Sequence, residues 1–197
     1  KRRRLAQRLL AVADAAKVRI STDIAGRKVK GKEETKRIIL GEGRQMYLLA
    51  AFDTATPFQR VVGWRDDFHK ADYDGYMAYE KKYPEIKKLP TFGGAKDGTF
   101  NVEQALTLKP DLVLMNLESK AATDEGKLIE KLQAVGVPVV FIDFREKPME
   151  HAEKSIRIMG ELVNNPQRAK EIVAFRRTQI EKVTDRLKNF AGPRPKV

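Results

Sequence analysis

The sequence predicts an α/β protein with a doubly wound, mainly parallel sheet (a Rossmann-like lobe), followed by a long α-helix. Short apolar runs alternate with helical patterns along most of the chain, which is typical of βαβ units. Two of these runs, at residues 112–115 and 137–142, are almost continuously apolar, as expected for parallel strands covered on both faces. The last periodic segment, residues 166–190, is longer than one crossover between strands requires.

The first predicted element is a hairpin over residues 18–29, because two short β-rich runs flank a turn at Ala25-Gly26. From Arg37 onward, strand-length apolar runs alternate with segments in which apolar residues recur at helical spacing. The predicted order is a strand at 38–40, a turn at 41–43, a helix at 45–52, a strand at 61–64, a helix at 72–83, a short strand and turn at 89–94, a helix from 101 that ends before 110, a strand at 112–115, a helix at 124–135, a strand at 137–142 and a helix at 149–163.

The stretch from Asn101 to Asn116 predicts a short helix, a sharp stop and a buried strand. Asn101 is suited to cap the helix, and Glu103 lies in its first turn, where a carboxylate favours the positive end of the helix dipole. Pro110 ends the helix because proline disfavours helical geometry in the preceding residue. Asn116 is therefore expected at the carboxyl edge of the sheet, where open α/β folds bind their ligands.

The long helix is expected to begin at Pro166, directly after Asn165, and to run to about residue 190. A helix of that length spans about 37 Å at 1.5 Å per residue. Its predicted apolar stripe consists of Ile172, Phe175, Ile180, Val183 and Leu187. Residues 191–197 break the helix, and we expect them to begin a second lobe that is missing from this chain.

Positive charge is concentrated near the amino terminus. Residues 1–37 hold thirteen Lys and Arg against four Asp and Glu, which accounts for most of the net charge of +12. Residues 1–17 are predicted to be a basic arm or a degenerate export signal, since Gln7 and Arg8 interrupt the apolar segment that a working signal needs. A basic arm on a nearly neutral body weakens the case for nucleic-acid binding, although a steep salt dependence in a gel-shift assay would support it.

The sequence lacks the residues that several classes of chemistry require. The chain has no cysteine, which excludes disulfides and thiol catalysis within it. His69 and His151 belong to no ligand-spaced cluster, so we expect no bound metal, and no catalytic triad or carboxylate pair indicates an enzyme. The remaining alternative is a cytosolic nucleotide-binding or regulatory domain, for which the turn at residues 41–43 is a weak fragment of a dinucleotide fingerprint.

Cationic residues follow several predicted strands at the same edge of the sheet. Fixed cations beside apolar or aromatic walls suit an anionic small molecule, and arginine is well suited to bind its carboxylate oxygens. Core packing is the competing interpretation for the tryptophan, and solvation is the competing interpretation for each charge. The candidate ligand-binding residues are Arg44, Trp64, Arg65, Lys120 and Arg145.

Several motifs together resemble the cluster A (class III) substrate-binding proteins of ABC importers, which carry iron–siderophore, haem or cobalamin ligands. The resemblance extends over nearly all of the chain from residue 18, and the segment at 108–113 is its most specific part. The motifs are the segment from Thr22 to Arg27, Lys36-Arg37-Ile38-Ile39, Val61-Val62-Gly63, Asn101-Val102-Glu103, Leu108-Lys109-Pro110-Asp111-Leu112-Val113, Gly136-Val137-Pro138-Val139-Val140 and Arg194-Pro195-Lys196-Val197.

The resemblance implies a periplasmic protein with two α/β lobes joined by one rigid helix, which holds a ferric siderophore or related metal chelate between the lobes and requires no cofactor. Residues 18–165 would be the N-terminal lobe and residues 166–190 the linking helix. In this family an acidic residue on each lobe docks onto the membrane permease, and the matching position here is Glu103. The competing interpretation of Glu103 is stabilisation of its own helix end.

Overall fold

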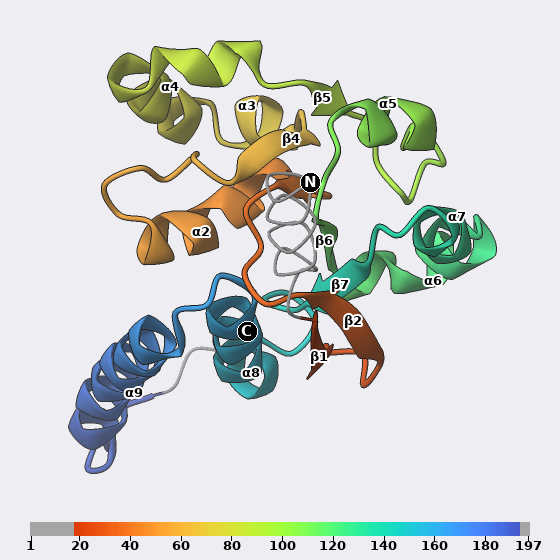
Figure 1. The fold of residues 1–197 in the computed structure, drawn as a ribbon. Coiled ribbons are helices and arrows are strands. Elements are labelled where there is room, and N and C mark those ends of the chain that lie inside the picture. The colour runs from red at the N-terminus through yellow and green to blue at the C-terminus, as the bar shows by residue number, and fades with distance from the viewer. Residues whose placement is uncertain (1–17, 194–197) are drawn as a thin grey trace, which may run out of the picture.

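The computed structural model describes residues 18–193; the arm expected at residues 1–17 and the last four residues, 194–197, lie outside them. Its centre is a five-stranded parallel sheet in the order β5-β4-β3-β6-β7, and a separate antiparallel hairpin precedes it (Figure 1). The strands are β1 (Val18–Thr22), β2 (Lys28–Lys32), β3 (Ile38–Leu40), β4 (Val61–Arg65), β5 (Thr91–Phe92), β6 (Leu112–Asn116) and β7 (Val139–Ile142).

Helices connect the strands in the order that the sequence predicted, and the doubly wound α/β fold is confirmed. The α-helices are α2 (Met46–Phe52), α3 (Asp67–Ala71), α4 (Tyr73–Lys82), α5 (Val102–Thr107), α6 (Lys120–Glu125), α7 (Leu128–Ala134), α8 (Pro148–Leu162) and α9 (Pro166–Leu187). Three 3-10 turns, at Gly43–Gln45, Pro84–Lys88 and Leu117–Ser119, complete the described secondary structure. Within residues 18–193, no helix combines the length and the apolar character that crossing a membrane requires.

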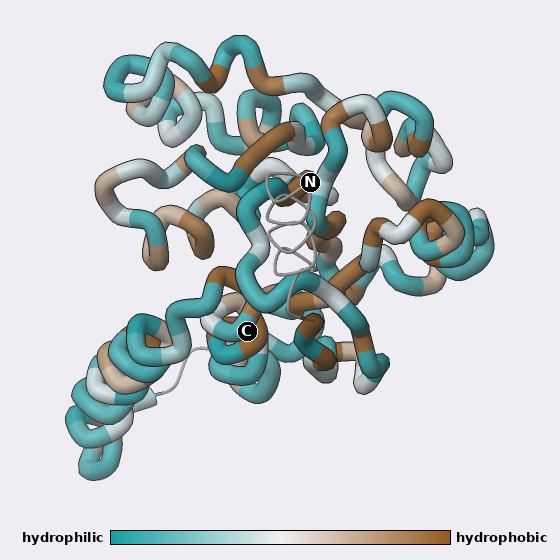
Figure 2. The backbone as a smooth tube through the Cα atoms, viewed as in Figure 1, coloured by the Kyte–Doolittle hydropathy of each residue, from teal (hydrophilic) through white to brown (hydrophobic). Residues whose placement is uncertain are grey.

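The alternating side chains of the strands divide the core into two layers. On β3, Ile38 and Leu40 face the layer under α2, α4, α8 and α9, whereas Ile39 faces the layer under α5 and α7. Successive apolar residues of β6 and β7 likewise face these two layers in alternation. Figure 2 shows the hydrophobic residues gathered in these strands. Burial on both faces explains why the strand sequences are almost continuously apolar.

The predicted hairpin is present and is fastened to the sheet by Asp23. The carboxylate of Asp23 accepts hydrogen bonds from the backbone N–H groups of Ala25 (3.1 Å) and Arg27 (2.9 Å), and Gly26 supplies the positive φ of +77° that the turn requires. The backbone N–H of Ile24 then donates to the carbonyl of Phe141 on β7 (3.1 Å). The backbone N–H of Phe141 also donates to Oδ2 of Asp23 (3.3 Å), so these two hydrogen bonds hold the hairpin against the edge of the sheet.

Two predicted boundaries are wrong. The single helix expected at residues 124–135 is two helices, α6 and α7, because the chain turns at Gly126 and at Lys127, whose φ is +53°. A left-handed residue cannot lie inside a right-handed helix. The strand expected from residue 137 begins at Val139, because Pro138 has no N–H to give to a ladder.

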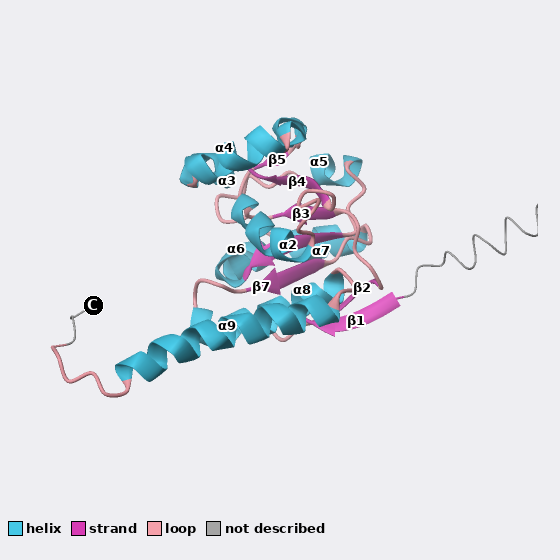
Figure 3. Cartoon of the chain, turned by 90° about the vertical axis from the view of Figure 1, so that its left-hand side faces the viewer, coloured by secondary structure: helices cyan, strands magenta, loops and turns pink. Residues whose placement is uncertain are grey.

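The long helix α9 begins at Pro166, as predicted, and ends at Leu187 rather than at residue 190. Its first turns pack on α8, where Ala169 and Val173 are buried and Gly160 permits close approach, since a Cβ on Gly160 would lie 2.5 Å from that of Ala169. The rest of α9 leaves the body of the lobe (Figure 3). The predicted apolar stripe is only partly buried, because Phe175 is 67% exposed and Val183 is 57% exposed.

Candidate ligand-binding site

The candidate site is built around the turn that follows β3, at the carboxyl edge of the sheet. Gly41 and Gly43 let this turn lie very close to its neighbours: a Cβ on Gly41 would lie 2.8 Å from the carbonyl oxygen of Leu114, and one on Gly43 would lie 2.5 Å from that of Arg65. Close packing on the backbone of neighbouring strands therefore explains both glycines. Between them, Glu42 is buried, with its carboxylate among the loops of the rim.

The carboxylate of Glu42 binds two arginines and one amide. Its Oε1 accepts from Arg145 and lies 2.9 Å from Nη2 of Arg44, while the side-chain amide of Asn116 donates to Oε2. Burial raises the pKa of Glu42 above its usual value, and the nearby Arg145 guanidinium opposes that rise. The three partners follow β3, β6 and β7, so this one carboxylate connects the ends of three strands.

A hollow of about 370 Å³ opens beside Glu42. Its polar lining comes from Glu42, Arg44, Gln45, Asn116 and Arg145. The rest of the wall is largely apolar and comes from α2, α8, α9 and the loop after β7: Tyr47, Leu48, Ala51, Ile142, Phe144, Ile156 and Ile172. A concave surface with a few convergent polar groups and apolar or aromatic walls is typical of small-molecule sites.

Tyr47 is held as a neutral phenol. Its side chain is 40% exposed, and its hydroxyl donates to Oδ2 of Asp72 (2.5 Å). Partial burial, with the hydrogen bond to the Asp72 carboxylate, raises the pKa of Tyr47 to about 12. The phenolate form of Tyr47 is therefore disfavoured, and Tyr47 lines the hollow as a neutral side chain.

A second group of charged side chains continues the rim toward β5. Glu118 accepts from Arg145 (3.3 Å) and lies 3.4 Å from Nζ of Lys96. Arg65 pairs with Asp97 at 3.8 Å, and its guanidinium lies over Gly94, where a Cβ would come within 2.8 Å of Cζ. Charged groups from the ends of all five strands of the sheet therefore line this rim.

The loop after β7 is organised by Asp143, which is 1% exposed. Its carboxylate accepts from the backbone N–H groups of Arg145 (2.8 Å), Glu146 (2.9 Å) and Lys147 (3.0 Å), and Nδ1 of His151 lies 2.6 Å from Oδ2. Burial alone would raise the pKa of Asp143, but these hydrogen bonds outweigh it and lower the pKa to about 2. Asp143 therefore fixes the backbone from which Arg145 reaches Glu42.

Of the five predicted ligand-binding residues, three lie on the rim and two do not. Arg44, Arg65 and Arg145 lie on the rim, with about a third of each side chain exposed. Lys120 begins α6 and pairs with Asp124 of its own helix. It lines neither the hollow beside Glu42 nor the second hollow of the rim, which lies between Arg65, Lys96 and Glu118.

Trp64 is only 3% exposed, so the expectation that it forms a wall of the ligand site does not agree with its position. Its ring packs edge-on against Phe58 and Phe68, at centroid distances of 5.7 Å each, with Tyr76 beside it. Because this aromatic cluster belongs to the core, we leave Trp64 out of the candidate site.

Sequence reasoning missed the carboxylates that hold the arginines. Glu42 and Glu118 lie in the same strand-end loops as the predicted cations, and an equal search for acidic residues in these loops would have found them. Their partners are distant in sequence, since Arg145 lies 103 residues beyond Glu42. Among residues 18–193, no group of three or more His, Cys, Asp or Glu side chains is arranged to hold a metal ion.

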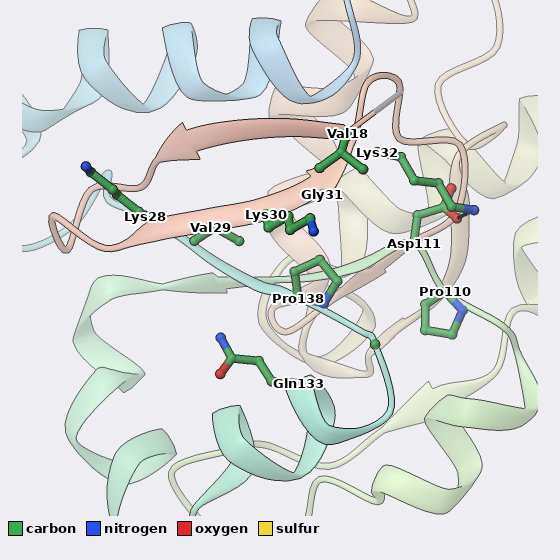
Figure 4. Close-up of a pocket in the computed structure, with 11 residues that line it drawn as sticks. Val18, Lys28, Val29, Lys30, Gly31, Lys32, Pro110, Asp111, Gln133 and Pro138 are labelled. Carbon is green, nitrogen blue, oxygen red and sulfur yellow. Dashed lines mark hydrogen bonds and ion pairs between the residues drawn. The ribbon is translucent and has the colours of Figure 1, made fainter. Parts of the chain in front are cut away.

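A larger hollow, of about 470 Å³, lies away from this rim (Figure 4). It lies between the hairpin and the segments that enter β6 and β7, at the amino edge of the sheet. Lys32 reaches Oδ1 of Asp111 there at 2.5 Å, and the other oxygen of Asp111 accepts from the backbone of Lys36 and Arg37. Asp111 therefore joins the hairpin to β6, which gives this region a structural role.

Residues 63–197 match the family described as "Periplasmic binding protein". The chain belongs to this family. The predicted membership of the class III binding proteins is confirmed, and the family is one of transport components rather than enzymes.

Solved structures and a curated relative agree with this assignment. The TroA-like periplasmic binding protein FepB from Veillonella parvula is 27% identical, with a TM-score of 0.80 over 89% of this chain and 51% of that protein. Molybdate-bound MolA from Haemophilus influenzae is 23% identical, with a TM-score of 0.70 over 88% of this chain and 55% of that one, a likeness of fold.

The curated relative is YvrC of Bacillus subtilis (strain 168), described as an uncharacterized ABC transporter substrate-binding lipoprotein. It is 29% identical over 110 residues, which are 55% of this chain and 33% of the relative. The chain therefore spans about half the length of the solved binding proteins and a third of this relative.

Proposed function

We propose that this binding protein is the ligand-capturing component of an ABC importer, that it works in the periplasm, and that it delivers an iron–siderophore-type chelate to the membrane permease. The observation that carries this proposal is the hollow beside Glu42, where arginines from separate strand ends face apolar walls. Related folds in which such ligands were found support it, including BauB bound to acinetobactin and ferric iron, with a TM-score of 0.63 at 15% identity.

We infer further that residues 18–165 are one of two lobes and that α9 is the helix that joins them. The solved binding proteins are about twice as long as this chain, which leaves room for a second lobe of similar size. The outer part of α9 carries exposed apolar residues, Phe175, Val183 and Leu187, which a second lobe would cover. In this arrangement the chelate is held between the two lobes.

The direct test is calorimetric titration of the complete natural protein with ferric siderophores, haem and molybdate. We expect submicromolar binding of a ferric siderophore and at least tenfold weaker binding of the other ligands, a difference of about 1.4 kcal/mol. Arg145→Gln should weaken the binding. Lys182→Gln, on the exposed surface of α9, is the matched control and should bind as the natural protein does. Absence of binding across the ferric panel would refute the iron–siderophore assignment.

Glu103 is the proposed contact with the permease. It is exposed in the first turn of α5. Since Glu103 lines neither hollow of the rim, Glu103→Arg should leave chelate affinity unchanged while it abolishes the stimulation of permease ATPase activity by the loaded binding protein. Glu130→Arg, in the first turn of α7, is the control for a reversed charge elsewhere. Full stimulation by the Glu103 variant would exclude this docking role.

A further inference from the structure

The cations of the rim are matched by carboxylates. Each of the four cations has at least one acidic partner within 4 Å among the described residues, and the numbers of the two kinds are equal. The pairs are Arg44 with Glu42 and Asp67, Arg65 with Asp97, Lys96 with Glu118, and Arg145 with Glu42 and Glu118. With every group ionised, the network as a whole carries no net charge. Glu42, Arg44 and Arg145 line the hollow beside Glu42, and the other members lie around it on the rim.

Glu42 is the central member of this network. Arg44 and Arg145 both reach its Oε1, and the side chain of Glu42 is only 10% exposed. An anionic ligand that binds the two guanidinium groups must approach this buried carboxylate or displace it from both arginines. Either event is unfavourable, because like charges repel strongly in a partly desolvated site and a buried carboxylate without its partners is costly.

The walls of the hollow favour a ligand with a large uncharged surface. Phe144 is 37% exposed and Tyr47 is a neutral phenol, and both line the hollow with aliphatic side chains of α2, α8 and α9. The hydrogen-bonding groups that remain free on the rim can orient a chelate without neutralising it, since guanidinium N–H groups beyond those used by Glu42 can still donate to ligand oxygens.

From the paired rim and the buried Glu42 we infer that this lobe is a charge-neutral half-site that selects metal chelates of net charge near zero, such as ferric hydroxamates, and that Glu42 is the residue that discriminates against multiply anionic chelates, such as ferric catecholates. This inference rests on the proposed function. Hydroxamates cancel the charge of ferric iron, whereas catecholates leave a large excess of negative charge on the complex.

The test compares the complete natural protein with its Glu42→Gln variant. A ferric trihydroxamate and a ferric triscatecholate are titrated into each protein by calorimetry. We expect the natural protein to prefer the trihydroxamate by at least tenfold. Glu42→Gln keeps a hydrogen-bond acceptor for the arginines but removes the negative charge, so it should shift the affinity ratio by about tenfold toward the triscatecholate.

Arg145→Gln provides an independent readout because it changes the charge in the opposite direction. It leaves the rim with one carboxylate in excess, so the ratio should move further toward the trihydroxamate. Glu130→Gln, on the surface of α7, should leave the ratio unchanged. Thermal unfolding of each variant without ligand shows whether it is folded.

The outcomes separate this inference from the proposed function. Binding of the triscatecholate as tightly as the trihydroxamate by the natural protein would overturn the neutral half-site. An unchanged ratio in a folded Glu42→Gln variant would overturn the role of Glu42. Failure of both chelates to bind would refute the proposed function itself, and the inference with it.

Discussion

Replacing Asp143 with asparagine should destabilise the protein and loosen Arg145. In the natural side chain, Oδ1 accepts from the backbone N–H groups of Arg145 and Glu146, while Oδ2 accepts from Lys147 and lies 2.6 Å from Nδ1 of His151. An amide has only one oxygen, so its NH₂ group must face donors on one of these two sides. Backbone N–H groups of this loop would be left without an acceptor, at a cost of about 2 kcal/mol.

The pH dependence gives a second estimate of the same effect. Because the pKa of Asp143 falls from its usual 3.8 to about 2 in the folded protein, its contribution is complete above pH 3.8 and is lost as the pH falls toward 2. At 1.36 kcal/mol per pKa unit, the contribution is about 2 kcal/mol. The two figures are similar in size, although the pKa shift also includes the opposing effect of burial.

Urea unfolding at pH 7, 5 and 3, followed by far-UV circular dichroism, measures the free energy of unfolding. The natural protein should lose more stability between pH 5 and pH 3 than Asp143→Asn does, and the two should converge at low pH. Asp185→Asn, at an exposed ion pair of α9, is the control and should cost less than about 1 kcal/mol. Equal stability of Asp143→Asn and the natural protein at pH 7 would refute this account of the loop.

Three further changes test the core and the rim. Trp64→Leu should lower the free energy of unfolding by about 3 kcal/mol in urea titrations, because it leaves a cavity in a buried aromatic cluster. An unchanged free energy of unfolding would mean that the Trp64 ring does not pack in the core. Gly63→Ala should cost about 2 kcal/mol by the same measurement, since its Cβ would lie 2.5 Å from Phe92 and 3.0 Å from Leu108, and an unchanged midpoint would contradict this crowding. Affinity for an anionic chelate should rise as the pH is lowered toward the raised pKa of Glu42, because protonation of Glu42 leaves the rim positive. The same rise in Glu42→Gln would exclude Glu42 as the cause.

The order of elements and the position of the rim could be predicted because both follow from local patterns. Apolar runs marked the strands, and the parallel arrangement placed Arg44, Arg65 and Arg145 at one edge of the sheet. The break between α6 and α7 could not be predicted from apolar spacing, since it depends on a left-handed conformation at Lys127.

The carboxylate partners are a different case, because ion pairs join residues that are distant in sequence. Nothing near Arg145 indicates that Glu42 is its partner, and nothing near Trp64 distinguishes a buried ring from a ligand contact. Strand-end position shows which residues can meet, whereas burial and side-chain reach decide which of them do.

The contact between Gly160 and Ala169 has a mechanical consequence. It lies at the start of α9, where that helix packs on α8. A small change in angle at this contact therefore moves the far end of the helix by a larger distance. A larger side chain at this contact would tilt α9. Because this 22-residue helix is about 33 Å long, a tilt of about 5° would displace its C-terminal end by about 3 Å. Two small residues at the base of α9 thus set the direction in which this helix leaves the lobe.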